Sequence, residues 1–111
     1  MKLTLLFASL LPLLLPTAAA WRMTFCTAAD TCEGETCQTI NGTATTEDCF
    51  QTPVKDAKSF FSELEGCTEL ATFSDTVCDH NSLNIAYDAI TVDKFCMAGT
   101  EYVTNSFGFV C

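Results

Sequence analysis

Eight cysteines are the residues of this sequence with the clearest chemistry. An even number of thiols in a chain this short is typical of a disulfide framework built in an oxidising compartment. Zinc sites need close cysteine pairs or histidine partners, but the cysteines are well spaced and His80 is the sole histidine. A redox centre normally carries C-x-x-C, which is absent. We therefore predict four disulfides, no metal site and no cofactor, with the cysteines being Cys26, Cys32, Cys37, Cys49, Cys67, Cys78, Cys96 and Cys111.

The other side chains of the sequence give little indication of a catalytic site. His80 is followed by Asn81 and Ser82 in a polar stretch typical of a solvated loop. A Ser-His-Asp triad would need a nucleophile motif, and G-x-S-x-G does not occur. Acidic residues are plentiful enough for a carboxylate pair, but so short a chain leaves little room for a substrate cleft and its supporting residues. We predict a non-enzymatic protein with no catalytic residues.

The N-terminus predicts export. Lys2 precedes an apolar run from Leu3 to Leu15, and Pro16 then leads to the small residues Ala18-Ala19-Ala20. This is the order of a signal peptide with an Ala-x-Ala cleavage site. A membrane anchor is disfavoured because the apolar run, about 13 residues, is shorter than the roughly 20 that span a bilayer. We predict a signal peptide at 1–20 and one secreted, extracellular, cysteine-rich domain at 21–111.

The charge of the chain limits the classes of partner that it could bind. Fourteen acidic residues face five basic ones, a net charge of −9, and removal of the leader takes Lys2 away as well. Nucleic acids and anionic membranes would be repelled by this charge. The acids are scattered along the sequence and suit a solvated surface, although a basic partner or a calcium ion stays open. We predict a monomer that binds an extracellular protein or glycan, neither nucleic acid nor membrane.

One modification motif is present. Asn41-Gly42-Thr43 is an N-glycosylation sequon. Because Asn-Gly is a favoured two-residue hairpin connection, we expect Asn41 on an exposed loop tip that carries a glycan. A glycosylated tip would lie away from the binding face.

The chain divides into two similar halves, at about 21–66 and 67–111. Cys32 to Cys49 and Cys78 to Cys96 span nearly the same number of residues. Each second cysteine is followed at the same distance by a Ser-Phe pair, Ser59-Phe60 and Ser106-Phe107. A repeat at about 46 or 47 residues predicts two copies of one supersecondary unit.

The local patterns are mostly those of strands. Alternation of large and polar residues predicts strands at 21–26, 69–73 and 102–109, with turns at Glu33-Gly34, Asn41-Gly42, Gly66 and Ala98-Gly99. Helical spacing competes in two places, 52–64 and 82–90. We predict a mainly β fold: a small, disulfide-stapled β-sandwich of two similar halves with one or two short helices. A compact α+β sandwich is the alternative.

The repeat also suggests how the cysteines pair, although eight cysteines allow 105 pairings. If the halves are equivalent, Cys32–Cys49 and Cys78–Cys96 would be corresponding bridges. Cys26–Cys37 and Cys67–Cys111 would then close the remaining loops.

The whole chain resembles the small cysteine-rich secreted proteins of ascomycete fungi, many of which are candidate effectors. The resemblance rests on the leader, the strand Trp21-Arg22-Met23-Thr24-Phe25, the eight cysteines and the acidic mature chain. The duplicated unit is also similar to a βγ-crystallin-type pair of Greek keys. The calcium motif of that fold is only partly matched, at 56–59 and 104–106, so calcium binding is not implied.

Binding is the function that these observations favour. The leading hypothesis is a secreted, non-enzymatic interaction protein that binds a host or competitor protein or glycan. The alternatives are an antimicrobial or killer-type toxin and an inhibitor of a secreted hydrolase acting through a loop at 28–35 or 79–84. Trp21, Tyr87 and Tyr102 would mark a binding surface if they were exposed on one face, and would be core if buried.

Overall fold

The computed structural model describes residues 20–43, 47–99 and 101–111. The predicted leader lies outside these residues except for Ala20, where the first strand begins. No helix in the described part is long and apolar enough to cross a membrane.

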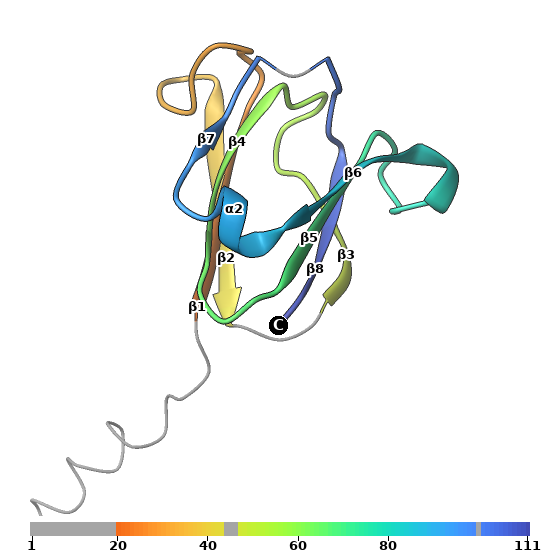
Figure 1. Cartoon of the computed structure of the whole chain (residues 1–111). Coiled ribbons are helices and arrows are strands. Elements are labelled where there is room, and N and C mark those ends of the chain that lie inside the picture. The colour runs from red at the N-terminus through yellow and green to blue at the C-terminus, as the bar shows by residue number, and fades with distance from the viewer. Residues whose placement is uncertain (1–19, 44–46, 100) are drawn as a thin grey trace, which may run out of the picture.

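The chain folds into two four-stranded antiparallel sheets that face each other (Figure 1). Sheet A has the strand order β2-β1-β4-β7, and sheet B has the order β3-β8-β5-β6. The predicted mainly β sandwich of two similar halves is confirmed. The elements are β1 (Ala20–Cys26), β2 (Cys37–Thr43), β3 (Glu47–Gln51), β4 (Ser59–Leu64), β5 (Glu69–Phe73), η1 (His80–Ser82), β6 (Leu83–Asp88), α2 (Ala89–Val92), β7 (Cys96–Met97) and β8 (Ser106–Val110).

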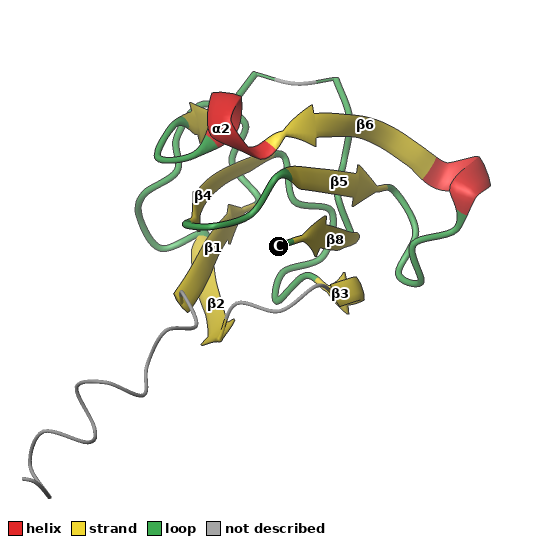
Figure 2. Cartoon of the chain, turned by 60° about the horizontal axis from the view of Figure 1, so that its bottom comes forward, coloured by secondary structure: helices red, strands yellow, loops and turns green. Residues whose placement is uncertain are grey.

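The two halves exchange one strand. Strands β1 to β4 of the first half correspond in order to β5 to β8 of the second. Each sheet holds the first, second and fourth strands of one half together with the third strand of the other, β7 in sheet A and β3 in sheet B. Figure 2 shows β3 beside β8, away from β1 and β2. Neither half can therefore form a complete sheet alone.

Matching backbone bonds relate the halves. Ala57 and Thr104 occupy equivalent places, and each backbone N–H donates to the other's carbonyl oxygen, at 3.0 and 2.8 Å. On either side of this pair, the Lys58 N–H donates to the Cys26 carbonyl, and Asn105 does the same to Phe73. The repeat read from the sequence is thus a pseudo-two-fold relation with Ala57 and Thr104 at its centre.

Inward-facing apolar side chains fill the space between the sheets. Along β1, Trp21, Met23 and Phe25 are buried while Arg22 points outward, the alternation of a strand with one face on the core. Seven aromatic rings form a connected cluster, six of them deep between the sheets and the seventh, Tyr87, joined through Phe60. The six rings between the sheets are Trp21, Phe25, Phe50, Phe60, Phe107 and Phe109.

All eight cysteines are bonded, but two predicted pairings are wrong. Cys26–Cys37 and Cys67–Cys111 are confirmed, whereas Cys32 bonds Cys96 and Cys49 bonds Cys78. The strand exchange is the reason. Cys49 lies in β3 and Cys96 in β7, the two strands that cross to the other half's sheet, so each meets the second cysteine of the opposite half. These two bridges correspond to each other, as the repeat requires, and they join the halves.

The short helices only overlap the ends of the second predicted helical stretch, 82–90, and the first stretch holds none. Residues 59–64 of the first helical candidate form β4, because Phe60, Ser62 and Leu64 are buried at a strand's period of two. Residues 83–88 of the second form β6, paired along β5. The helices that do occur are η1 and the single turn α2. The C-terminal strand begins at Ser106, so 102–105 of the predicted strand precede it.

Glycines explain why three of the predicted turns are confirmed and why the fourth is wrong. Gly34, Gly66 and Gly99 have φ values of 115°, 85° and 73°, in the left-handed region that favours glycine. Asn41-Gly42 is not a turn but part of β2. A Cβ placed on Gly42 would lie 3.0 Å from the Trp21 ring, so glycine is present there to make room for the indole.

Candidate functional site

Of the three aromatic residues that were expected to mark a binding surface if exposed, one is buried and two are not. Trp21 is 3% exposed and packs in the core, against Phe50 and Phe109. Tyr102 is 45% exposed, and Tyr87 is half-buried. The tyrosines therefore define a candidate surface, and Trp21 does not belong to it.

Both tyrosines lie on the side of the sandwich between the edge strands β6 and β7, which we call the open side. Tyr87 of β6 packs edge-on against the buried Phe60, with ring centroids 5.7 Å apart. Met97 of β7 lies opposite Phe60 in the sheet. Burial raises the pKa of the Tyr87 hydroxyl, and the electrostatic effect of Tyr102 raises it further. Tyr87 and Met97 thus lie beside Phe60 as half-exposed side chains, and Tyr102 lies close enough to affect Tyr87 electrostatically.

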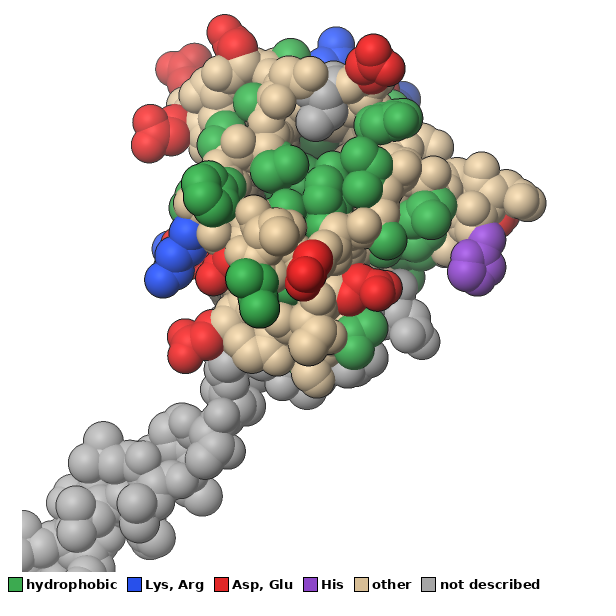
Figure 3. Space-filling model, viewed as in Figure 1, with side chains coloured by type: hydrophobic (Ala, Val, Ile, Leu, Met, Phe, Trp, Pro, Cys, Tyr) green, Lys and Arg blue, Asp and Glu red, His purple; other side chains and the backbone are tan. Residues whose placement is uncertain are grey.

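Further apolar side chains flank this cluster. Ile90 of α2 is 79% exposed and Phe95, just before β7, is 62% exposed. Figure 3 shows hydrophobic side chains gathered in the middle of this face, with acidic ones around them. Exposed Asp88 and Glu101 directly adjoin the apolar residues in the chain. We call the set Tyr87, Ile90, Phe95, Met97 and Tyr102 the open-side patch.

The loop after β1, residues 27–36, is held rigidly. Cys26–Cys37 closes its base, and Cys32–Cys96 ties its middle to β7. The Ser59 hydroxyl lies 2.8 Å from the Ala28 carbonyl oxygen and 2.6 Å from that of Thr31, and donates to them. This loop is one of the two predicted to enter a hydrolase, and its backbone is fixed from three directions.

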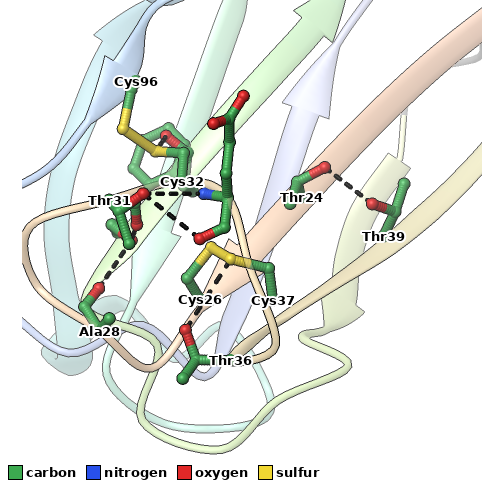
Figure 4. The surroundings of a disulfide bond; sticks show 12 residues. Thr24, Cys26, Ala28, Thr31, Cys32, Thr36, Cys37, Thr39 and Cys96 are labelled. Atoms are coloured by element: carbon green, nitrogen blue, oxygen red, sulfur yellow. Dashed lines mark hydrogen bonds between the residues drawn. A yellow bond between two sulfur atoms is a disulfide. The ribbon is translucent and has the colours of Figure 1, made fainter.

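A polar groove of about 510 Å³ lies between this loop and the outer face of sheet A. Thr24 and Thr39 form its floor and share a hydrogen bond of 2.8 Å (Figure 4). Arg22 and Glu63 lie across from each other at 3.9 Å. Its remaining lining is Asp30, Thr31, Cys32, Glu33, Phe61 and Cys96. Hydroxyls, charged groups and one aromatic ring therefore surround this space, whereas the open-side patch is apolar.

The other predicted loop, 79–84, carries His80. The imidazole is exposed on η1, where the Asp79 carboxylate accepts the Asn81 N–H at 3.0 Å and caps the turn. His80 lines a shallow groove on the outer face of sheet B with Glu69, and the rest of that lining is apolar: Ala71, Phe73, Leu83, Ala86, Gly108, Phe109 and Val110. No hydroxyl or thiol side chain lines it, so this groove brings no nucleophile to His80.

The partial calcium motifs have a structural role. The Asn105 amide donates to the Asp56 carboxylate at 2.8 Å and to the Ser74 carbonyl at 2.9 Å. The Asp56 N–H donates back to the Asn105 side-chain oxygen at 2.7 Å. These residues tie the halves together near the pseudo-two-fold centre. Within the described residues, no group of three or more His, Cys, Asp or Glu side chains is placed to hold a metal ion.

Comparison with protein-family models, curated proteins and solved structures finds no match. The open-side patch is thus defined by its own geometry. Sequence reasoning named its tyrosines but missed Ile90, Phe95 and Met97. A signal existed for Met97, because the repeat places Met97 at the position of Phe50, and Tyr87 at that of Ile40. Ile90 and Phe95 lie in the β6–β7 connection, and the repeat places them at Thr43 and Asp48, which are not large apolar residues.

Proposed function

We propose that this chain is a secreted, non-enzymatic binding protein that docks a protein partner on the open-side patch. The observation that carries the proposal is the exposure of Ile90, Phe95 and Tyr102 around a half-buried Tyr87. Exposed apolar patches with a polar rim are typical of protein interaction sites, and aromatic residues are the side chains most often found at their energetic centre.

Export is part of the proposal. Four disulfides in a small domain are consistent with an extracellular protein, and the predicted leader would supply the route. We assign the chain to the class of small cysteine-rich fungal effector candidates. The strand exchange between two like halves supports the resemblance to a βγ-crystallin-type pair of Greek keys.

The charges around the patch indicate the partner's chemistry. Asp88 and Glu101 adjoin the two tyrosines, Lys94 adjoins Phe95, and the chain as a whole has a net charge of −9. A partner with an apolar recess and a basic rim would bury the patch and meet these carboxylates. Complementary charge of this kind mainly speeds association, so binding should weaken as salt is added.

The test is a capture experiment with matched surface variants. The mature protein, Tyr102→Asp and Val110→Asp would each be immobilised and exposed to plant extracellular fluid. Tyr102 and Val110 are 45% and 46% exposed, but Val110 lines the outer groove of sheet B and is not part of the patch. We expect one protein to be retained by the wild type and Val110→Asp and lost from Tyr102→Asp.

Three results would contradict the proposal. Capture that is equal for all three proteins would remove the patch from the interaction. Capture lost only with Val110→Asp would move the site to sheet B. Growth arrest of competing microbes by both variants as well as the wild type would favour the toxin hypothesis.

A hydrolase inhibitor is the second candidate, because the 27–36 loop is fixed by two disulfides and by Ser59. A loop that is rigid before binding loses little entropy on entering a cleft. Inhibition of secreted proteases and glycosidases would be measured with the wild type and Asp30→Ala/Glu33→Ala, two exposed positions of the loop. Inhibition lost in this variant but kept in Tyr102→Asp would favour the inhibitor over patch docking.

A further inference from the structure

The sequon residue Asn41 lies on the same outward face as the polar groove of sheet A. Along β2, Ile40 packs against the core and Gly42 lies under the Trp21 ring, so Asn41 between them points outward and is exposed. The expected loop tip is thus the outer face of an edge strand. Asn41 does not itself line the groove, but its neighbours on this face, Arg22 and Thr39, do.

The pairing register places Asn41 at the rim of that groove. Asn41 is the direct cross-strand partner of Arg22. Thr39, two residues before Asn41 in β2, lies on the same face. Side chains that are directly opposite on one face of a sheet have Cβ atoms about 5 Å apart. A sugar attached to the Asn41 amide therefore begins beside Arg22, Thr24 and Thr39, all of which line the groove.

The lining of the groove suits a carbohydrate. The hydroxyls of Thr24, Thr31 and Thr39 and the carboxylates of Asp30 and Glu33 can exchange hydrogen bonds with sugar hydroxyls and the N-acetyl group. Phe61 offers an apolar ring to a sugar face. A volume of about 510 Å³ lies within the range of small-molecule sites.

We propose that Asn41 carries an N-linked glycan and that its first sugars lie along the groove of sheet A, covering Arg22 and Phe61. The groove is then the seat of the chain's own glycan and not a site for a free ligand. The glycan would also cover the outer edge of β2, a free strand edge on which another chain could pair. This inference is independent of the proposed partner, because the open-side patch lies at the opposite edges, β6 and β7.

Arg22 offers a direct readout because it is the sole arginine of the sequence. The protein would be secreted from a glycosylating yeast, and intact mass would establish occupancy. Phenylglyoxal, which modifies arginine, would then be applied to the glycoprotein, to the same protein after enzymatic removal of the glycan, and to Asn41→Gln. We expect modification of Arg22 to be several-fold slower in the glycoprotein than in the other two.

A relocated glycan is the matched control. In Asn41→Gln/Leu83→Thr the sequon moves to Asn81-Ser82-Thr, beside the groove of sheet B. Arg22 in this variant should react as fast as in Asn41→Gln. In the wild-type glycoprotein, nuclear Overhauser contacts should join one of the first sugars to the Phe61 ring.

The proposal would be overturned by an unoccupied Asn41 in the secreted protein. It would equally fail if Arg22 reacted at one rate with and without the glycan, or if the relocated glycan slowed Arg22 as much as the native one. Slower Arg22 modification without a sugar contact to Phe61 would show a glycan that leans over Arg22 but leaves the groove open, which also contradicts the proposal.

Discussion

The two open edges of the sandwich are equivalent by the repeat and differ in how they are closed. Between β2 and β3, on what we call the Trp21 side, Phe50 packs 5.0 Å from the Trp21 ring and stacks on Phe107 and Phe109. On the open side, the equivalent residue is Met97, and the position of Trp21 is taken by the exposed Thr68. There Tyr87 packs edge-on against Phe60, with ring centroids 5.7 Å apart.

The difference shows how one scaffold supports two surfaces. Equivalent inward positions remain buried in both halves, as with Met23 and Leu70, both fully buried, or Phe60 and Phe107. The edges are under less constraint, because the sheets already hold each other through the core and the bridges. Thr68, in place of the large indole of Trp21, leaves the aromatic side chains of the open side partly exposed.

The largest expected effect on stability comes from removing a disulfide that joins the two halves. Cys32→Ser/Cys96→Ser removes a bridge between residues 64 apart, whereas Cys26→Ser/Cys37→Ser opens a hairpin of separation 11. Closing the longer loop restricts the unfolded chain more, so we expect losses of about 4 and 3 kcal/mol in the free energy of unfolding. Urea denaturation measures both. The reverse order would mean that Cys32–Cys96 does not hold the halves together.

A smaller contrast is expected between the two equivalent edge residues. Phe50→Ala removes contacts with three aromatic rings, while Met97→Ala removes a side chain at the less crowded open side. We expect about 3 kcal/mol of destabilisation for Phe50→Ala and about 1 for Met97→Ala, since neither residue is fully buried. Thermal unfolding of the two variants gives the comparison. Equal losses would show that the open side is packed as tightly as the Trp21 side.

The smallest effect is a pH dependence confined to the open side. The pKa of Tyr87 is raised by burial, so the folded protein holds this proton at pH values where the unfolded chain, with a tyrosine pKa of about 10, has released it. Stability from Tyr87 is therefore complete below pH 10 and falls as pH rises above it. Tyr87→Phe should show a shallower alkaline fall in melting temperature than the wild type. Ile40, its counterpart, does not titrate, so Ile40→Val should keep the wild-type slope.

The repeat and the strand alternation were sufficient to predict much of the fold. The stretches 21–26 and 69–73 match β1 and β5 because each has one buried face. At 59–64 and 83–88 short apolar runs fitted both periods, and sheet pairing decided for strands. Asn41-Gly42 resembled a turn because the other reason for a glycine, space under the Trp21 ring, is visible only after folding.

The disulfide pairing and the open-side patch could not be predicted from the local sequence pattern. The repeat shows which cysteines are equivalent, but bridges within each half and bridges across the halves satisfy it equally. Only the crossing of β3 and β7 decides between them. Similarly, Tyr102 was identified by its type alone, whereas Ile90 and Phe95 belong to a connection whose exposure depends on what the sheets leave uncovered.

The most direct test of the exchanged halves is trypsin cleavage of the denatured but unreduced protein. Trypsin cuts after Lys55, Lys58 and Lys94, so the fragment 23–55 contains Cys26, Cys32, Cys37 and Cys49. With Cys32–Cys96 and Cys49–Cys78 in place, mass spectrometry should find 23–55 joined to the fragments 59–94 and 95–111. The fragment 23–55 should be free only after reduction. Release of 23–55 without reduction would show that its four cysteines pair among themselves, and would contradict the account.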